Sequence, residues 1–244
     1  MKKFICTLLC LVPLTLQASA FDCSTLPSWQ QLKDALTKAR NGDNGGLNLD
    51  MWGTLVAVDG TVCAVAFTGN NFGDQWLGSR VISAQKANTS NAFSLNKLSL
   101  STANLYSAVQ PGGALYGLQH SNPVDTQVAY TGSAQDFGKQ NDPMVGKRIG
   151  GVNVFGGGLA LYNPKGERVG AVGVSGDTSC ADHNIAWRLR SELKLDFVPS
   201  GVSLANDDNI IYLGKSEKAS GFKHPRCGGK EDKVKLVPIR KKES

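Results

Sequence analysis

The sequence predicts an α+β domain in which helices pack on an antiparallel sheet. Two pairs of short apolar runs are each joined by a tight turn, Asp59-Gly60 in the first pair and Asn163-Pro164-Lys165-Gly166 in the second, which is typical of β-hairpins. Segments with apolar residues at helical spacing precede, separate and follow these pairs. Strands and helices do not alternate one by one, so the pattern does not favour a parallel sheet.

The first part of the chain predicts a helix, a hairpin and a second helix. Residues 26–40 carry apolar side chains at helical spacing after Ser28, a suitable N-cap. Residues 51–58 and 61–67 form the hairpin. Residues 80–93 form the second helix, whose small side chains allow close packing on the sheet. A shorter helix follows, capped by Ser101 or Thr102, and it ends before Pro111-Gly112-Gly113.

The second hairpin and the helix after it carry the most information. Its predicted strands are residues 158–162 and 168–174, and the second is apolar and small on both faces. This pattern is typical of a central strand with something packed closely on each side. Ser175-Gly176-Asp177 turns the chain into the last helix, on which Arg190 is expected at the surface. From residue 198 the chain is loop-like, apart from a strand candidate at 209–213.

This segment resembles the GlcG/HbpS-like family of heme-binding proteins, which is related to the C-terminal domain of PduO-type proteins. The matching residues are Gly150-Gly151-Val152, the run Gly170-Ala171-Val172-Gly173-Val174-Ser175-Gly176, and Asp182 in the helix that follows. The upstream hairpin also fits, and the resemblance covers residues 28–195. Asn153 departs from the family, which usually has proline there, and the Gly156-Gly157-Gly158 run is a second departure.

The resemblance implies a profilin- or PAS-like architecture, with an antiparallel sheet of about five strands flanked by helices. It also implies heme as the cofactor and a homo-oligomer as the assembly. The family does not share one axial ligand, so no iron ligand carries over from it. What carries over is the Gly150-Gly151 segment and the Gly173–Gly176 turn, as walls of a pocket or an interface.

Residues 1–20 predict a secretory signal peptide. Lys2 and Lys3 precede a short apolar run that ends in Ala18-Ser19-Ala20. The alternative is a retained membrane anchor, for which the run is uncomfortably short. We therefore expect residues 21–229 to form one periplasmic or secreted domain, with terminal extensions tied down by disulfides, and residues 230–244 to form a basic tail.

The net charge of +6 does not indicate a nucleic-acid surface. The signal peptide carries two of these charges and the tail carries three, from six basic and three acidic residues, so the domain between them is nearly neutral. We expect the tail to be solvated, with an electrostatic contact to a membrane or an acidic partner as the alternative. No stable membrane insertion is expected, because no later segment is long and apolar enough.

Four cysteines follow the signal peptide, and an even number in an exported protein indicates two disulfides. Three pairings are open. We favour Cys23–Cys63 and Cys180–Cys227, because each bridge would hold a terminal segment on the central domain. The alternative is a thiolate site for a metal or heme, although no C-x-x-C spacing is present.

Common enzyme signatures are incomplete in this chain. The run Gly173-Val174-Ser175-Gly176-Asp177 lacks the last glycine of a nucleophile elbow. Gly146-Lys147 lacks the serine or threonine of a phosphate-binding loop, and Gly156-Gly157-Gly158 does not complete a dinucleotide-binding pattern. An enzyme acting on a small organic acid or a corrinoid stays a weaker hypothesis, because no acid–base pair stands out.

Histidine is a common ligand of heme iron, and His120 is the one that we expect to contact it. It follows a glycine-rich loop, and a plain hydrogen-bonded loop histidine is the alternative. His183 is expected in capping or at the surface, and His224 is expected to be structural. The basic candidates for the heme propionates are Arg80, Lys147 and Arg148. The complete expected cofactor site is His120, Arg148, Gly150, Gly151, Ser175 and Gly176.

These observations predict an exported heme-binding protein that captures or buffers heme or supports its degradation. The alternative is a non-enzymatic sensory or accessory module that binds another small ligand or a protein partner. In that case the residues after Asp196 would form the contact surface.

Overall fold

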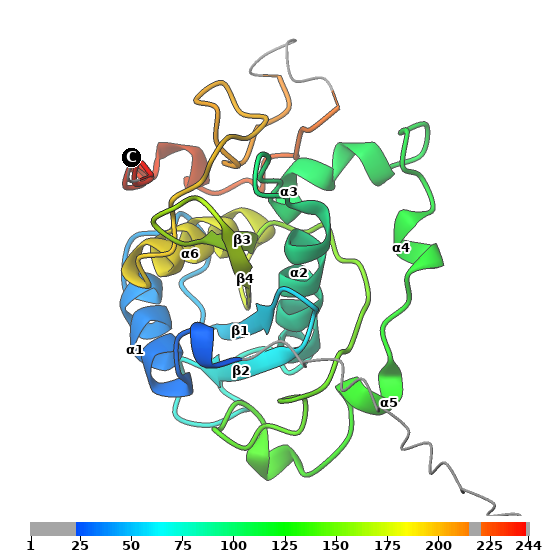
Figure 1. Ribbon diagram of the computed structural model, residues 1–244, viewed down its shortest axis with the longest axis vertical. Helices are drawn as coiled ribbons and strands as arrows, with labels where there is room; N and C mark the ends of the chain where they lie inside the picture. Colours follow the sequence, from blue (N-terminus) through cyan, green and yellow to red (C-terminus); the bar gives the residue numbers. More distant parts are fainter. Residues whose placement is uncertain (1–22, 215–220, 243–244) are drawn as a thin grey trace, which may run out of the picture.

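The computed structural model describes residues 23–214 and 221–242, and a four-stranded antiparallel sheet forms the centre of this part (Figure 1). The strands are β1 (Trp52–Ala57), β2 (Val62–Phe67), β3 (Gly158–Tyr162) and β4 (Arg168–Ser175), in the order β2-β1-β4-β3. The expected signal peptide lies outside the described residues. No helix within these two ranges is long and apolar enough to cross a membrane.

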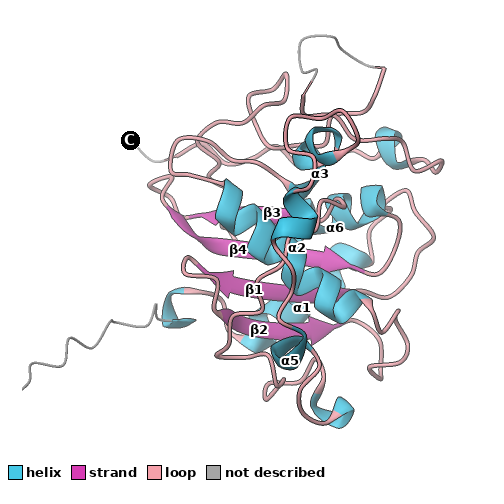
Figure 2. Cartoon of the chain, turned by 90° about the vertical axis from the view of Figure 1, so that its right-hand side faces the viewer, coloured by secondary structure: helices cyan, strands magenta, loops and turns pink. Residues whose placement is uncertain are grey.

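Helices cover both faces of the sheet. On one face lie α1 (Trp29–Arg40) and α6 (Ser179–Glu192), and on the other lies α2 (Ser79–Phe93) (Figures 1 and 2). The remaining helices are short: η1 (Cys23–Thr25), α3 (Thr102–Leu105), η2 (Ser107–Val109), α4 (Leu118–Ser121), α5 (Thr126–Ala129), η3 (Ala134–Asp136) and η4 (Glu231–Lys233). The two predicted hairpins and the three long helices are therefore confirmed, and Ser28 caps α1 as expected.

Two expectations about the fold are corrected. The sheet has four strands in the described part of the chain, not about five, because residues 209–213 contribute only the isolated bridge between Tyr212 and His224. The stretch 230–242 is not a solvated tail. Leu236 and Ile239 pack against the apolar core, and the Arg240 guanidinium pairs with the Asp196 carboxylate. Apolar residues scattered among the charges of this stretch anchor it to the domain.

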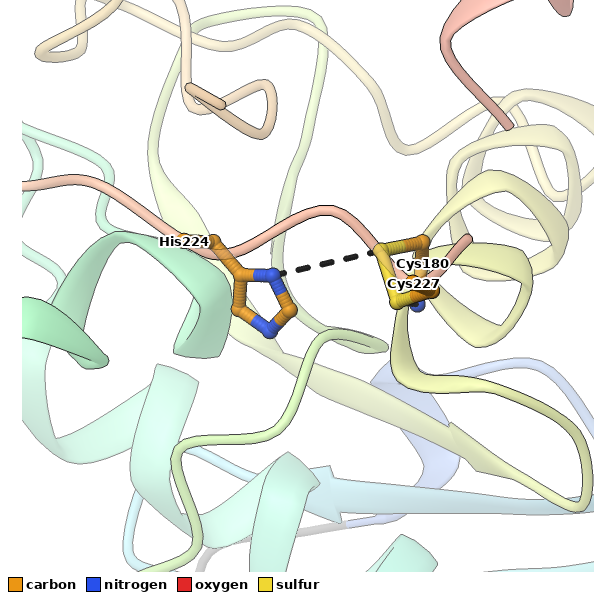
Figure 3. A group of neighbouring side chains, drawn as sticks. All are labelled: Cys180, His224 and Cys227. Atoms are coloured by element: carbon orange, nitrogen blue, oxygen red, sulfur yellow. Dashed lines mark hydrogen bonds between the residues drawn. A yellow bond between two sulfur atoms is a disulfide. The ribbon is translucent and has the colours of Figure 1, made fainter. Parts of the chain in front are cut away.

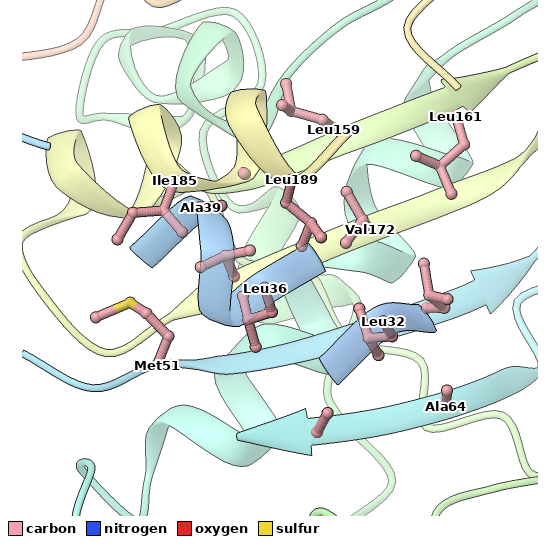
Figure 4. Close-up of a cluster of buried hydrophobic side chains, with 14 of the residues drawn as sticks. Leu32, Leu36, Ala39, Met51, Ala64, Leu159, Leu161, Val172, Ile185 and Leu189 are labelled. Atoms are coloured by element: carbon pink, nitrogen blue, oxygen red, sulfur yellow. The ribbon is translucent and has the colours of Figure 1, made fainter. Parts of the chain in front are cut away.

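The core under α1 and α6 is a row of cross-strand side chains. Leu55 of β1 and Leu159 of β3 both pair with Val172 of β4, which lies between them. Figure 4 shows side chains of both helices over this row, among them Leu36 and Ile185. Their close packing accounts for the strict apolar pattern of the central strands.

Helix α2 approaches the other face of the sheet much more closely. A β-carbon added at Gly173 would lie 1.9 Å from the Ser83 carbonyl oxygen, and one added at Gly158, its cross-strand partner, would lie 2.4 Å from the Lys86 carbonyl oxygen. The Thr54 and Ser83 hydroxyls share a hydrogen bond of 2.7 Å across the same contact. The backbone of α2 therefore rests directly on the sheet, which only glycine permits.

Buried ion pairs link α2 and α6 to other parts of the fold. Lys86 of α2 donates from Nζ to the Asp182 carboxylate of α6 at 2.8 Å and to the Val174 carbonyl at 2.9 Å. Burial raises the pKa of Asp182 to about 6 and lowers the pKa of Lys86, while their mutual attraction opposes both shifts. A second pair joins Arg190 to Asp208 through two hydrogen bonds of 2.7 Å.

Arg190 and His183 were expected at the surface or in capping, and both expectations are wrong. Each has a relative exposure of 0%. The helix that carries them lies between the sheet and the C-terminal segment, so it is covered on more than one side. The sequence periodicity cannot show this second covering, because it comes from residues far along the chain.

Both favoured disulfides are present. Cys23–Cys63 ties η1 to β2, and Cys180–Cys227 ties the first turn of α6 to the C-terminal segment. They close loops with sequence separations of 40 and 47 residues. Loops of this size give stabilisation on the order of 2–4 kcal/mol each, through restriction of the unfolded chain.

The substitution Gly173→Ala is expected to destabilise the fold by about 1–3 kcal/mol or more, because the new methyl group meets backbone atoms of α2 that cannot move alone. Urea unfolding measures the change. Gly73→Ala is the matched control, since nothing lies within 4 Å of its added β-carbon. Equal stability of the two variants would show that α2 does not need the glycine at residue 173.

The stability contribution of His183 is expected to depend on pH. Burial lowers its pKa to about 4, whereas the unfolded side chain titrates near 6.5. Between these two pH values His183 is protonated in the unfolded chain but neutral in the folded chain. The free energy of unfolding therefore falls as the pH falls through this window. The raised pKa of Asp182 acts in the opposite direction, and therefore a variant must isolate the histidine.

The stability advantage of the wild type over His183→Gln should shrink by about 2.5 kcal/mol between about pH 7.5 and about pH 4.5. Urea unfolding at both values measures it. Asp182 is common to both proteins, so its own titration cancels. An advantage that is the same at both values would mean that His183 is not held neutral in the folded state.

Candidate functional site

The four motif residues of the expected cofactor site lie in two separate places. Gly150 and Gly151 lie beside α2, where a β-carbon at Gly151 would meet the Gln85 side chain and the Gly151 carbonyl accepts from Asn88 at 2.8 Å. Ser175 and Gly176 are buried at the end of β4. The structure brings each pair into contact with different elements and does not gather all four around one cavity.

The backbone explains why glycine stands at residues 150, 151 and 176. Gly150 and Gly151 have φ of 61° and 80°, a region that disfavours other residues. A β-carbon at Gly176 would lie 2.4 Å from the Asp50 carbonyl oxygen, just before β1. These residues shape the chain at the two ends of the matched motif.

His120 is exposed on the short helix α4. Four residues later, Val124 forms an antiparallel bridge with Gly150, so the His120 segment ends beside the Gly150-Gly151 pair. Arg148 is also exposed and pairs with Asp59. Arg80 is buried in a two-bonded ion pair with Asp142, which leaves its guanidinium unavailable to a ligand.

An apolar groove precedes the His120 helix in the chain. We call it the 107–115 groove, and its volume is 470 Å³, within the range of small-molecule sites. No charged side chain is among its lining residues, which are Ser107, Ala108, Pro111, Gly112, Gly113, Ala114, Leu115, Gly221 and Phe222. Leu115 is 40% exposed, Tyr116 follows it at 62%, and α4 begins two residues later. Lys223, next to Phe222, is half-buried, and its carbonyl oxygen accepts from the Ser107 N–H at 3.1 Å.

The start of α6 forms a second, polar place. The Asp177 carboxylate accepts from the backbone N–H groups of Leu47 and Leu49, at 2.9 and 3.2 Å, and the Asp182 carboxylate accepts from the Asp177 N–H at 2.9 Å. These bonds hold the 41–50 loop on the helix start. Both carboxylates are therefore engaged with backbone donors or with Lys86, and Asp177 also lines a pocket of 270 Å³ together with residues between Arg40 and Leu49.

A thiolate metal site was named as an alternative for the cysteines in the sequence analysis, but His224 was not included in it. Cys180, His224 and Cys227 offer ligand atoms that all lie within 4.8 Å of one another. The signal in the sequence was the short spacing His224-Pro225-Arg226-Cys227, two residues between histidine and cysteine. The third member, 44 residues from His224, could be placed only by the fold.

A second pocket lies where the C-terminal segment crosses α6. Its volume is 290 Å³. It is lined by Asn184 of α6 and by residues 203–212 and 231–236, with apolar Ile211 and Leu236 beside the Glu231 carboxylate. Most of this lining lies beyond the strands and helices of the central domain.

Comparison with known proteins identifies the central domain. A family model described as "Haem degrading protein HbpS-like" matches residues 51–189. No curated protein matches the chain. Among solved structures, the chain is similar to a PduOC:heme complex, with 24% identity, a TM-score of 0.46, and coverage of 67% of this chain and 89% of that one. It is also similar to the Klebsiella pneumoniae protein ORFY of the DUF336 family, with 23% identity, a TM-score of 0.47, and coverage of 75% and 97%.

The family match spans more than half of the chain and takes in the whole sheet, α2 and most of α6. It also contains His120 and both predicted glycine motifs. This chain belongs to the HbpS-like family.

Proposed function

We propose that this chain is an exported heme-binding protein that captures or buffers heme, or supports its degradation, outside the cytoplasm. Membership of the HbpS-like family, whose model is described as haem degrading, is the observation that carries the proposal. The signal-peptide pattern and two disulfides support an oxidising compartment, the periplasm or the extracellular space. We assign the sheet, with helices on both faces, to the profilin- and PAS-like architecture and propose a homo-oligomer as the assembly.

The 107–115 groove is the place that we propose for the porphyrin. A porphyrin needs an apolar slot with a cation near its propionates. The groove offers uncharged walls, and Lys223 follows the lining residue Phe222 in the chain. His120 lies five residues after Leu115, on the helix that follows the groove wall, and its exposed imidazole is free to approach iron. Arg148, on the surface beside the Gly150-Gly151 pair, is a second candidate for a propionate.

A second candidate function is a sensory or accessory module for another small ligand or a protein partner. The 290 Å³ pocket favours it, because most of its lining comes from residues 203–212 and 231–236, outside the family match. The heme titration below separates the two functions.

Hemin titration of the oxidised protein should give a saturable Soret shift at about one heme per chain. His120→Ala should alter the position or intensity of the band, because a different ligand then faces the iron. Gln119→Ala, on the same helix, is the matched control. An unchanged spectrum in His120→Ala would remove His120 from the iron, and no shift beyond that of a non-binding protein would favour the second candidate function.

The substitution Leu115→Glu should weaken hemin binding at least about tenfold, since a charge replaces an apolar wall residue that contributes on the order of 1.5–3 kcal/mol when covered. Leu77→Glu is the control, because Leu77 is an exposed leucine outside the groove. The dissociation constants come from the same titration. Equal affinities for the two variants would place the heme elsewhere.

A further inference from the structure

Two cysteines and a histidine gather at the start of α6. Cys180 lies in the first turn of this helix, while His224 and Cys227 belong to the C-terminal segment, beyond the family match at residues 51–189. Figure 3 shows the His224 ring facing the disulfide between the two cysteines. Two thiolates and an imidazole form a donor set that suits zinc and similar divalent ions.

Neighbouring groups hold the His224 ring in place. Its Nε2 lies 3.2 Å from the Ser179 hydroxyl, and the ring packs on Tyr106 with 4.9 Å between centroids. Its Nδ1 lies 3.9 Å from Cys180 Sγ and 2.6 Å from the Pro225 carbonyl oxygen. A carbonyl can only accept, so Nδ1 carries the ring proton in this disulfide form. Metal binding through Nδ1 requires the ring proton on Nε2, where Ser179 can accept it, and a turn of the ring that moves Nδ1 from the Pro225 carbonyl toward the sulfurs.

The surroundings also favour thiolates and a cation. The backbone N–H of Cys180 donates to Cys227 Sγ at 3.2 Å, at the positive end of a 14-residue helix, and both features stabilise a negative sulfur. Glu231 is 4% exposed, and its Oε1 accepts from the Cys227 N–H at 2.7 Å. Its Oε2 has no hydrogen-bond partner among the described residues, so a buried carboxyl oxygen that could accept a bond from a metal-bound water lies beside the group. Cys227 is half-buried, which gives an ion a way in.

We infer that reduction of the Cys180–Cys227 disulfide opens a metal site formed by Cys180, Cys227 and His224, which takes Zn²⁺ or a similar divalent ion. A dithiol reductant supplies two electrons and two protons, and the S–S bond breaks into two thiols while the reductant becomes a disulfide. Each thiol releases its proton to solvent as its sulfur binds the ion, and the ion keeps its charge. The sulfurs then lie about 3.8 Å apart around a tetrahedral ion with bonds of about 2.3 Å. The fourth position is left for water.

Cobalt(II) tests the site, because it takes zinc geometry and gives a thiolate-to-metal charge-transfer band. The chain without residues 1–20, whose Cys6 and Cys10 would also offer thiolates, is titrated with and without prior treatment by a phosphine reductant, which is removed before cobalt is added. The reduced protein should bind one cobalt per chain with this band, and the oxidised protein should show no band. His224→Ala should weaken binding at least about tenfold. The double variant Cys180→Ser/Cys227→Ser should lose the band.

The matched control is Cys23→Ser/Cys63→Ser, which removes the disulfide that has no such ligand group around it in the described part of the chain. It should keep the band. A reduced wild type that binds no more cobalt than Cys180→Ser/Cys227→Ser overturns the inference. If reduction unfolds the chain, circular dichroism decides. Recovery of the native spectrum on addition of cobalt supports the site, and no recovery overturns it.

Discussion

The close contact between α2 and the sheet is the constraint on which the rest of the structure depends. Glycines at 158 and 173 remove the side chains that would otherwise hold the helix away from the strands. Because α2 lies so close to the sheet, the side chain of Lys86 passes Gly157 and reaches Asp182 on α6. A single ion pair thus connects the helix layer on one face to a helix of the other. Breaking it would leave an unpaired charge in the interior, which is more costly than the pair itself.

This arrangement explains why the family motif around β4 consists of small residues. Most of the run from Gly170 to Gly176 lies in β4, one of the two inner strands. It admits α2 on one side and carries Val172 and Val174 to the core on the other. Its last glycine lets the chain turn against Asp50 and start α6. The motif therefore identifies the family through backbone packing. The groove that we propose for the porphyrin lies elsewhere, mostly in the long connection between α2 and β3.

The C-terminal segment adds a further structural layer to the family domain. It covers α6, buries Arg190 against Asp208, and brings His224 and Cys227 to Cys180. Exported domains commonly use such a bridge for stability alone. Here the Cys180–Cys227 disulfide joins α6 to the C-terminal segment, and that segment also lines the 290 Å³ pocket. Heme chemistry and thiol chemistry would then use different surfaces of one small domain.

The sequence by itself determined the local elements, the family and the disulfide candidates. Turn residues, helical spacing and the N-cap at Ser28 act over a few residues, so hairpins and helices could be predicted nearly to their ends. His120 and the glycine-rich loop before it were visible for the same reason. Only the tertiary structure decided what is buried. His183, Arg190 and Arg80 are covered by residues tens of positions away, and the three metal-ligand candidates meet across a comparable separation. Burial and side-chain encounter depend on long-range packing, and a periodic pattern carries no information about which distant segment will cover which face.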